Sequence, residues 1–430
     1  MVIKKYKLSD VAKVEISSVD KKTKDCETPV KLCNFTDVYH NWAITTEMAD
    51  NFMKATANAK EIEKFTIRKG QVAFTKDSET RDDIGISTYI ADDFENVLLG
   101  YHCALITPDE SKISGKYLNA FMHSAYIQKY FELNATGSGM RYTLSLETLQ
   151  SMPLLLPSLE EQEAIGNLFS SIDRKIALNR SINQNLEALA KQLYDYWFVQ
   201  FDFPDENGRP YKSSGGKMVW NEKIKREIPV KWEVKSLSSV AIVNQKSLSK
   251  EDILTEIEYL DTSSLTENNI TETQQIFKEE APSRAQRKVK QRTILYSTVR
   301  PRLKHYGILC NPASNLIVST GFATIDALDI RLAYYIYYVL TKKSITEYLG
   351  SIADTAVSSY PSINPTDLES INVVIPDERL IKAFDETISP LYELKEDSAK
   401  TIQTLIKQRD ELLPLLMNGQ VSLNSDLSNG

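Results

Sequence analysis

Two long stretches of the chain carry apolar residues at the spacing of an α-helix that buries one face. They cover residues 158–200 and 377–419 of the 430-residue sequence. Apolar positions recur in each at intervals of seven, with a polar gap near Asn179 in the first stretch and Ser398 in the second. This pattern is typical of helices that pair as a coiled coil, and a polar residue on the seam can fix their register.

A helix of about 40 residues is roughly 60 Å long, at about 1.5 Å per residue. One small domain cannot cover that length, although each helix could still pack on its own domain over part of it. We therefore favour antiparallel pairing of the two helices. Such pairing would give the chain an approximate two-fold axis and place one globular domain at each end of a rod of fixed length.

The residues before each helix indicate that one module is written twice. With a shift of 219 residues, positions 148–157 (TLQSMPLLLP) overlay positions 367–376 (DLESINVVIP). Each segment is a short apolar strand that ends in proline, directly before the helix. Positions 71–75 and 293–297 also match, but at a different shift, as insertions would cause. Because the matches keep their order, chance similarity is the weaker explanation.

The globular part of each module mixes β-rich strings with helical stretches, which predicts an α+β fold with a curved, mostly antiparallel sheet. The residues after the first helix are rich in Pro, Gly, Asp, Asn and Ser, which is typical of an extended connector. The expected order is a globular domain at 1–157, a helix at 158–200, a connector at 201–232, a globular domain at 233–376, a helix at 377–419 and a tail at 420–430.

The ends of the helices carry recognisable signals. Ser158 and Glu161 have the spacing of a capping box at the start of the first helix. Asp377 is the expected cap of the second helix. Pro390 is expected to bend the second helix or to delay its regular part, and Pro414 to loosen its last turn before a stop at residues 418–419.

Composition narrows the class of protein. Hydrophobic residues make up 42% of the chain and charged residues 25%, which is ordinary for a globular protein with buried cores. The longest apolar run, at 332–340, is far shorter than the roughly 20 residues of a membrane span. No apolar core follows the N-terminal lysines, so we expect no signal peptide. The four cysteines form no CxxC pair, which argues against a zinc site and fits a reducing cytoplasm.

Motifs for catalysis are missing from the sequence. It has no D/N-P-P-Y/F loop of an amino-group methyltransferase, no GxxxxGK[ST] phosphate loop and no HExxH. Asp377 followed by Glu393 and Lys395 imitates the PD…ExK spacing of a nuclease. The helical pattern would place that aspartate about 24 Å from the other two residues, so we reject the nuclease. No catalytic or metal-binding residue is expected.

The net charge of −7 argues weakly against nucleic acid as a partner, so the distribution of charge has to decide. Residues 284–305 hold eight Lys or Arg and no Asp or Glu. A charge run is most often a solvated face. This one, however, spans a strand and a proline-stiffened turn at 300–305, which suits contacts to phosphate and guanine. The counterpart in the first module, at 68–81, is weaker.

A small-residue loop precedes each strand–proline junction, at 136–142 and at 355–360. Small residues let backbone amides approach a phosphate. The basic segments and these loops together supply the candidate DNA-binding residues. They are Lys76, Ser78, Thr80, Arg81, Ser138, Arg141 and Tyr142 in the first module, and Arg284, Arg287, Lys288, Arg300, Arg302, Lys304, His305, Ser358 and Tyr360 in the second.

Four further segments complete the picture. They are LLLPSLEEQ at 154–162, FDFPDENG at 201–208 with Pro229 and Trp232 beyond it, FTKDSE at 74–79 and YSTVRP at 296–301. Together with the repeat, these segments resemble the specificity (S) subunits of type I restriction-modification systems. The resemblance covers nearly the whole chain and is more specific in combination than in any single segment. One departure is that Pro361 stands where the first module has Tyr142, so individual contacts need not transfer between modules.

The resemblance implies that each globular part is a target recognition domain for one half of a split site in double-stranded DNA. It implies helices that set the spacer and dock two methyltransferase (M) subunits, which bind S-adenosylmethionine and methylate adenine. Restriction (R) subunits, where present, would use ATP and Mg²⁺. The chain itself would be a cytoplasmic, non-catalytic protein of phage defence without a cofactor. The helix residues expected to bind partners are Ile165, Ile172, Leu186, Leu193, Trp197, Leu391, Leu405 and Leu412.

One alternative stays open. A helical scaffold or adaptor protein would carry the same helices, and its basic segments would be incidental to DNA.

Overall fold

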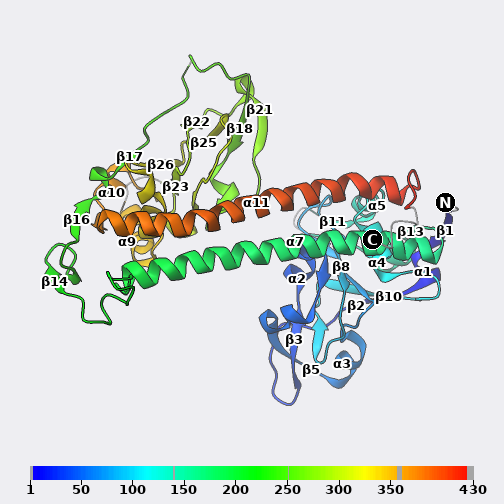
Figure 1. Ribbon diagram of the computed structural model, residues 1–430. Coiled ribbons are helices and arrows are strands. Elements are labelled where there is room, and N and C mark those ends of the chain that lie inside the picture. The colour runs from blue at the N-terminus through cyan, green and yellow to red at the C-terminus, as the bar shows by residue number, and fades with distance from the viewer. Residues whose placement is uncertain (1–2, 139–140, 250, 356–360, 424–430) are drawn as a thin grey trace. The chain divides into compact units, whose positions relative to one another are not determined.

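The computed structural model describes residues 3–138, 141–249, 251–355 and 361–423 (Figure 1). The chain divides into two compact units. Unit 1 consists of Met1–Arg180 and Lys400–Gly430, and unit 2 consists of Ser181–Ala399. Unit 1 therefore holds the globular domain of the first module, called module 1 below, and unit 2 holds that of the second, called module 2. Each unit also contains a segment of each long helix. These helices are α7 (Leu159–Tyr194) and α11 (Glu378–Met417).

The globular domain of unit 1 is built on a five-stranded sheet in the order β2-β10-β6-β8-β4. Its neighbouring strands are antiparallel except β4 and β8, which run parallel. The four residues of β6 are all buried, and α4 (Gly115–Met122) and α5 (Ala125–Asn134) contribute to the core beside them. The strands are β2 (Ala12–Ile16), β10 (Cys103–Pro108), β6 (Val72–Thr75), β8 (Ser87–Ile90) and β4 (Ala43–Ile44).

A second sheet of unit 1 has the order β5-β3-β9, with an antiparallel pair and a parallel pair. Its apolar face forms a separate small core with Phe65 at the end of α3. The elements are β5 (Met53–Ala57), β3 (Thr28–Cys33), β9 (Val97–Leu99) and α3 (Ala59–Phe65). Unit 1 also has two short helices, α1 (Leu8–Val11) directly before β2 and α2 (Phe35–His40) after β3.

The globular domain of unit 2 repeats this arrangement with two four-stranded sheets, in the orders β17-β26-β23-β24 and β21-β18-β25-β22. The helices beside the first sheet are α8 (Ala333–Leu340) and α9 (Lys343–Asp354). The strands are β17 (Ala241–Val243), β26 (Phe322–Ala327), β23 (Ile294–Ser297), β24 (Tyr306–Ile308), β21 (Gln274–Phe277), β18 (Glu256–Leu260), β25 (Leu316–Ser319) and β22 (Ala285–Lys288), with a two-stranded ribbon of β19 (Leu265–Thr266) and β20 (Asn269–Ile270).

The strand orders show that the repeat extends through the central sheets, further than the sequence matches suggested. Strands β2, β10, β6 and β8 correspond in order to β17, β26, β23 and β24. The shift between them is 229 residues at β2, 222 at β6 and 219 at β10. The loops between strands therefore absorb the length differences, which is why a single shift could not reveal the match. The predicted α+β class with two domains and long helices is confirmed.

Each globular domain is closed by pairing of its first strand with its last. In unit 1, β1 (Lys4–Lys7) runs antiparallel to β13 (Pro153–Leu156). In unit 2, β16 (Glu233–Ser236) runs antiparallel to β27 (Asn372–Ile375). The last strands are the predicted apolar strands before the long helices, and each follows a short helix, α6 (Leu146–Gln150) or α10 (Pro365–Glu369). This pairing fixes the point at which the chain enters the helix.

Most of the predicted helix-end signals are confirmed. The Ser158 hydroxyl accepts from the Glu161 amide at 3.3 Å while the Glu161 carboxylate accepts from the Ser158 amide at 3.1 Å. The Asp377 carboxylate accepts from the amide of Leu380 at 3.0 Å. At the far end Gly419 has φ +69° after the last helical residue, as a glycine stop requires. The expected delay at Pro390 is wrong, because α11 starts twelve residues before it and continues through it.

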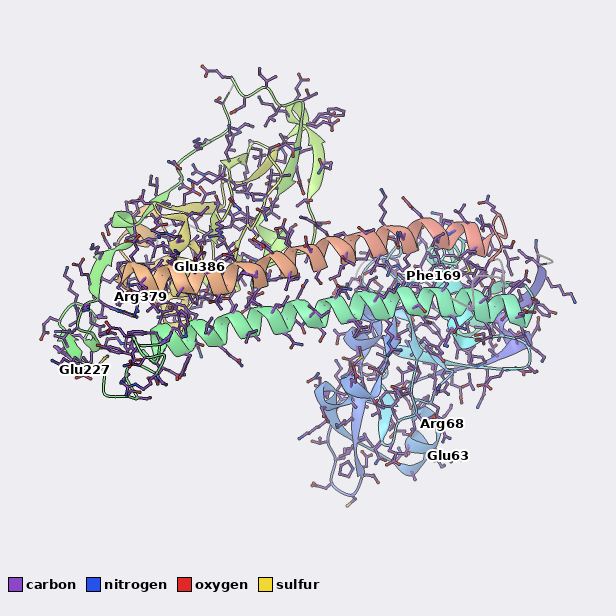
Figure 2. The ribbon with its side chains drawn as sticks, in the orientation of Figure 1. Glu63, Arg68, Phe169, Glu227, Arg379 and Glu386 are labelled. Atoms are coloured by element: carbon purple, nitrogen blue, oxygen red, sulfur yellow. The ribbon has the colours of Figure 1, made fainter. Side chains whose placement is uncertain are left out.

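In both units the two long helices share a core with each other and with the globular domain. In unit 1, Ile165 and Phe169 of α7 are buried with Leu416 and Met417 of α11. Figure 2 labels Phe169 on α7. In unit 2, Tyr194 near the end of α7 is buried with Phe384 and Tyr392 of α11. In unit 1 the start of α7 packs with the end of α11, and in unit 2 the end of α7 packs with the first half of α11, so the two helices run antiparallel. The helices therefore pair with each other and also pack on the globular domains.

The segment after α7 is more ordered than the predicted extended connector. It continues as a short π-helix (Asp195–Val199) and then forms a hairpin of β14 (Met218–Asn221) and β15 (Arg226–Pro229). Phe203 stacks on Trp232 with a ring separation of 5.2 Å, and both rings are buried in the core of unit 2. The expectation failed because aromatic residues within this polar segment supply enough apolar surface to pack. Among the described residues, no helix could cross a membrane.

Candidate nucleic-acid interface

In module 1 the structure brings together two segments that the sequence singled out separately. Residues 77–78 form β7, and β11 (Thr136–Ser138) pairs antiparallel with β12 (Arg141–Thr143). These strands make a three-stranded sheet in the order β11-β12-β7, in which Tyr142 lies opposite Ser78 and Thr143 opposite Asp77. The basic segment and the small-residue loop therefore belong to one surface.

Gly137 has a structural role in this sheet. It has φ +143°, and a Cβ atom at this position would lie 2.1 Å from the carbonyl oxygen of Arg141 on the paired strand. Only glycine permits such a close approach of two backbones. The glycine of the loop therefore allows the hairpin to form and so places Arg141.

Asp77 is the centre of a charged cluster on this sheet. Its carboxylate accepts from Nζ of Lys76 at 2.9 Å, from Nη2 of Arg141 at 2.8 Å and from Nδ1 of His102 at 2.7 Å. Burial by itself raises the pKa of Asp77, but hydrogen bonds from His102, Lys76, Thr143 and Arg141 outweigh it and hold the pKa well below its usual range. The carboxylate is therefore ionised at any physiological pH.

The acid at the centre of this cluster is buried, whereas Arg141 is largely exposed. The side chain of Asp77 is 8% exposed, whereas that of Arg141 is 57% exposed. The neighbouring Arg81 lies over the ring of Tyr142 at 5.0 Å, a cation–π contact. The amide of Thr80 donates to the Ser78 hydroxyl at 3.3 Å. Ser138 lies in β11. All seven candidates of module 1 thus lie on this sheet or on the loop that leaves it.

Asp77 and His102 were not among the residues predicted from the sequence. Asp77 lies inside the basic segment at 68–81, and an acid among basic residues is a signal for an ion pair. His102 gave no signal, since it lies 25 residues further along the chain. It reaches the cluster because its carbonyl accepts from the amide of Lys76, at 3.1 Å.

In module 2 the corresponding backbone contacts are present with different side chains. The amide of Arg300 donates to the carbonyl of Pro361, and Val299 bridges Ser362. The amide of Thr298 donates to the carbonyl of Gly321, as that of Lys76 does to His102. Thr298, Val299 and Gly321 therefore take the places of Lys76, Asp77 and His102. The candidates Ser358 and Tyr360 lie outside the described residues.

The basic run of module 2 is largely neutralised by carboxylates from distant elements. Arg302 donates to Glu347 at 3.2 Å and to Asp354 at 2.6 Å, and both acids belong to α9. Lys304 pairs with Glu267 at 2.7 Å. Lys288 pairs with Asp252. The run is free of acids in sequence but not in space, so it is not a continuous patch of unpaired positive charge.

Three further candidates of this run lie at its two ends. Within the described part of the chain, Arg284 and Arg287 have no carboxylate at ion-pair distance, and Arg287 donates to the Ser247 hydroxyl at 3.3 Å. Nδ1 of His305 lies 2.7 Å from the carbonyl oxygen of Leu265, which occupies that nitrogen. Of these candidates, Arg284 on the loop before β22 is exposed and Arg287 on β22 is half-buried.

Arg300 and Lys304 flank a tight turn, η6 (Pro301–Leu303), and both have left-handed backbone conformations, with φ +47° and +59°. Such a conformation in a residue with a side chain stores backbone strain of roughly 1–3 kcal/mol. Pro301 between them is buried, which holds the turn against the domain. The predicted stiff basic turn is present, and strain of this kind is concentrated at functional sites in proteins.

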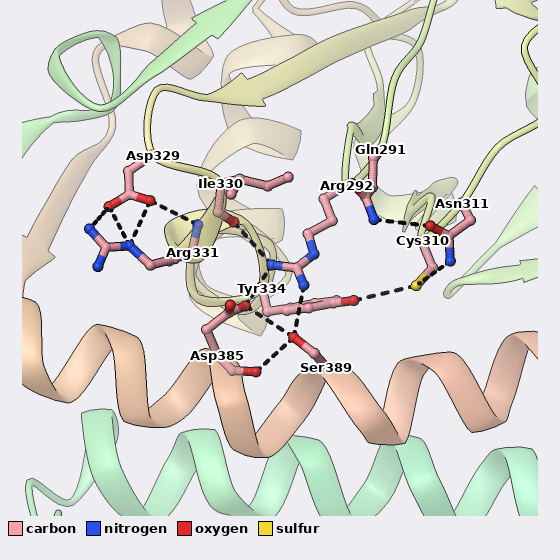
Figure 3. Close-up of polar contacts among 10 residues, drawn as sticks. All are labelled: Gln291, Arg292, Cys310, Asn311, Asp329, Ile330, Arg331, Tyr334, Asp385 and Ser389. Atoms are coloured by element: carbon pink, nitrogen blue, oxygen red, sulfur yellow. Dashed lines mark hydrogen bonds and ion pairs between the residues drawn. The ribbon is translucent and has the colours of Figure 1, made fainter.

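Arg292, in the middle of the run, serves a structural contact (Figure 3). It donates to Asp385 at 2.7 Å and to the Ser389 hydroxyl at 2.9 Å, and it lies over the ring of Tyr334 at 4.9 Å. Nearby, Arg331 pairs with Asp329 at 2.7 Å. The contacts of Arg292 with Asp385 and Ser389 hold the start of β23 to α11, and the Arg292 side chain is only 13% exposed.

The helix residues predicted to bind partners pack inside their own units. Ile165, Ile172 and Trp197 are buried. Leu193 and Leu391 pack against the core of unit 2, Leu405 and Leu412 against that of unit 1, and Leu186 is half-buried. A different apolar row of α7 and its extension is open in unit 2, at seven-residue spacing. Its members are Ile182, Leu189 and Tyr196, which are 48%, 52% and 39% exposed.

Over the described ranges, no group of three or more His, Cys, Asp or Glu side chains is placed to hold a metal ion.

Comparison with known proteins agrees with this architecture. Residues 3–188 match the family model "Type I restriction modification DNA specificity domain". The chain is 25% identical over 321 residues to the type I restriction enzyme MjaIX specificity subunit of Methanocaldococcus jannaschii, covering 74% of this chain and 71% of that protein. It is 22% identical over 446 residues to the HindI specificity subunit of Haemophilus influenzae, covering 91% and 94%.

The fold has a solved counterpart. The crystal structure of the type I restriction-modification S subunit from M. genitalium superposes with a TM-score of 0.58 at 16% identity, covering 96% of both chains. Residues 3–188 therefore belong to the family of type I restriction modification DNA specificity domains, and the chain as a whole is similar to the specificity subunits of type I restriction enzymes.

Proposed function

We propose that each globular domain reads one half of a bipartite DNA site and that the chain is a non-catalytic subunit of a type I restriction-modification complex. One observation carries this proposal. In both modules, two segments far apart in sequence meet at the same place in the fold, and the side chains there differ completely. A shared framework with different side chains suits the reading of two different sequences, because base readout depends on a few side chains at the groove.

The long helices would hold the two domains at a set spacing and dock the two M subunits. The row of Ile182, Leu189 and Tyr196 supports this role for α7 and its extension, since it is a regular apolar row that is left exposed. The chain would bind no cofactor itself. S-adenosylmethionine would belong to the M subunits, and ATP with Mg²⁺ to R subunits where these are present, in the cytoplasm.

The test is selection of DNA from a randomised pool by the chain together with its M partner. The expected result is enrichment of one split sequence with two short defined halves and a spacer of constant length. Selection of a single uninterrupted site, or of none, would contradict the proposal. A helical scaffold would show DNA binding without enrichment, and its binding would not depend on the M partner.

The spacer has a test of its own. Deletion of one heptad from both helices, in register, should shorten the preferred spacer and leave both half-sites unchanged. An unaltered spacer would show that the helices do not set the distance.

A further inference from the structure

Arg141 is held on one side and open on the other. Its Nη2 atom donates to Oδ2 of Asp77 at 2.8 Å, and the guanidinium also contacts the ring of His102. Asp77 is itself held by Lys76 and by the pairing of β7 with β12. The arginine therefore stands on a rigid, ionised support, yet more than half of its side chain is exposed.

The free donors of Arg141 match one base in particular. A guanidinium has five N–H donors in a planar fork, and Asp77 occupies only part of them. Two parallel N–H groups fit the N7 and O6 acceptors of guanine in the major groove. Adenine and cytosine each present an amino donor at this edge, and thymine a methyl group. An arginine oriented by a buried carboxylate discriminates best, because its fork cannot turn to meet another base.

We propose that module 1 reads one guanine of its half-site through Arg141, with Asp77 as the residue that positions it. This inference rests on the proposed function. Asp77 keeps the guanidinium in one orientation, and Lys76 with His102 keeps the carboxylate in place. Among the described residues, module 2 has no such carboxylate–arginine pair at this place, since Val299 stands in the place of Asp77 and Gly321 in that of His102. This way of orienting an arginine toward guanine therefore belongs to module 1.

The experiment uses the full chain with its M partner and the bipartite site obtained by selection. Each guanine of the module 1 half-site is replaced in turn by 7-deazaguanine, which lacks the N7 acceptor. With the wild-type chain, one replacement should weaken binding roughly tenfold or more. With Arg141→Gln, the same replacement should have no further effect, and the preference for guanine at that position alone should be lost.

Asp77→Asn tests the positioning role separately. This variant keeps Arg141 but removes the charge that orients it, so discrimination at the same guanine should fall. Loss of a negative charge should leave affinity for non-specific DNA equal or higher, with no weaker salt dependence. A merely structural role would lower both kinds of binding together. Arg209→Gln is the matched control, because Arg209 is also an exposed arginine paired with a carboxylate, Asp205, but lies in the connector.

Three outcomes would overturn the inference. The first is a module 1 half-site without guanine, and the second is Arg141→Gln with undiminished guanine preference. The third is equal weakening by Arg141→Gln at every sequence, which would identify a phosphate contact. In all three the wild-type chain still selects a split site, so the proposed function stands. Failure of the wild-type chain to select any split site would overturn both.

Discussion

The two modules make the same backbone contacts where the strands β6 and β23 end, yet they treat charge in opposite ways. Module 1 gathers Lys76, His102 and Arg141 around one ionised acid, Asp77, and leaves the arginine open. Module 2 has neutral residues at the corresponding positions and ties its cations to acids of other elements, as Arg302 is tied to α9. A framework can thus be copied while its chemistry is replaced, because the backbone hydrogen bonds do not depend on the side chains.

The largest expected effect tests whether the two units fold independently of each other. Phe131 on α5 is fully buried and stacks on Phe74 with a ring separation of 6.4 Å. Phe131→Ala should destabilise unit 1 by about 3–5 kcal/mol, through loss of apolar burial and the cavity left behind. Selection with this variant should lose the module 1 half-site and keep the module 2 half-site.

Tyr126→Ala is the control, because Tyr126 lies on the same helix with its side chain 47% exposed. It should change the free energy of unfolding by no more than about 0.5 kcal/mol. Loss of both half-sites with Phe131→Ala would show that the units do not fold independently.

A difference in acid stability is expected between the units. Burial lowers the pKa of His123 in unit 1 to about 4, and its ring stacks on Trp42 at 4.5 Å. A histidine with a depressed pKa binds fewer protons when folded, so stability is lost as the pH falls below about 6.5 toward 4. The loss attributable to His123 should reach about 3 kcal/mol. The corresponding helix end of unit 2 carries Thr341, which does not titrate.

The measurement is the free energy of unfolding of the wild type and of His123→Gln between pH 7 and pH 4. Burial raises the pKa of Asp173 to about 6, which acts in the opposite direction, but this carboxyl is common to both proteins and cancels in the difference. A difference that does not change with pH would refute the assignment.

The difference in charge between the two modules can be tested at Val299, which stands in the place of Asp77. Val299 is 38% exposed, so Val299→Asp should not disturb folding. Without the counterparts of Lys76 and His102, the new carboxylate should repel DNA and weaken binding about three- to tenfold at moderate salt. The titration should be repeated across salt concentrations, and Val299→Asn serves as the uncharged control. Equal binding by both variants would mean that this edge does not face DNA.

The smallest expected effect concerns two arginines of module 2, Arg284, which has no ion pair among the described residues, and Arg302, which has two. Arg284→Ala should reduce the salt slope of DNA binding by about one unit if this exposed side chain contacts one phosphate. Arg302→Ala should leave the slope unchanged, because both ends of its guanidinium are occupied by Glu347 and Asp354. Binding isotherms at four or five salt concentrations are sufficient. The reverse order of effects would mean that the ion pairs of Arg302 open on DNA.

The repeat, the class of fold, the position of the helix starts and the absence of known catalytic motifs could all be predicted from the sequence. These are local properties, or properties of order along the chain. The capping residues Ser158 and Asp377 show this well, since each cap needs only the next three residues. The aromatic packing of residues 201–232 could not be predicted, because it depends on a core that the rest of unit 2 supplies.

The order of residues along the chain is enough to show that this protein is one module written twice, with two long helices and two candidate surfaces. Which charges on those surfaces are open depends on contacts between residues far apart in the sequence. Glu347 and Asp354 lie some 45 and 52 residues from Arg302 in sequence, and His102 lies 25 from Asp77, so no local pattern relates them. The same holds for the helices, where periodicity shows that apolar rows exist but not which row is buried. Burial and ion pairing are set by what the fold brings near, and that is decided by long-range packing.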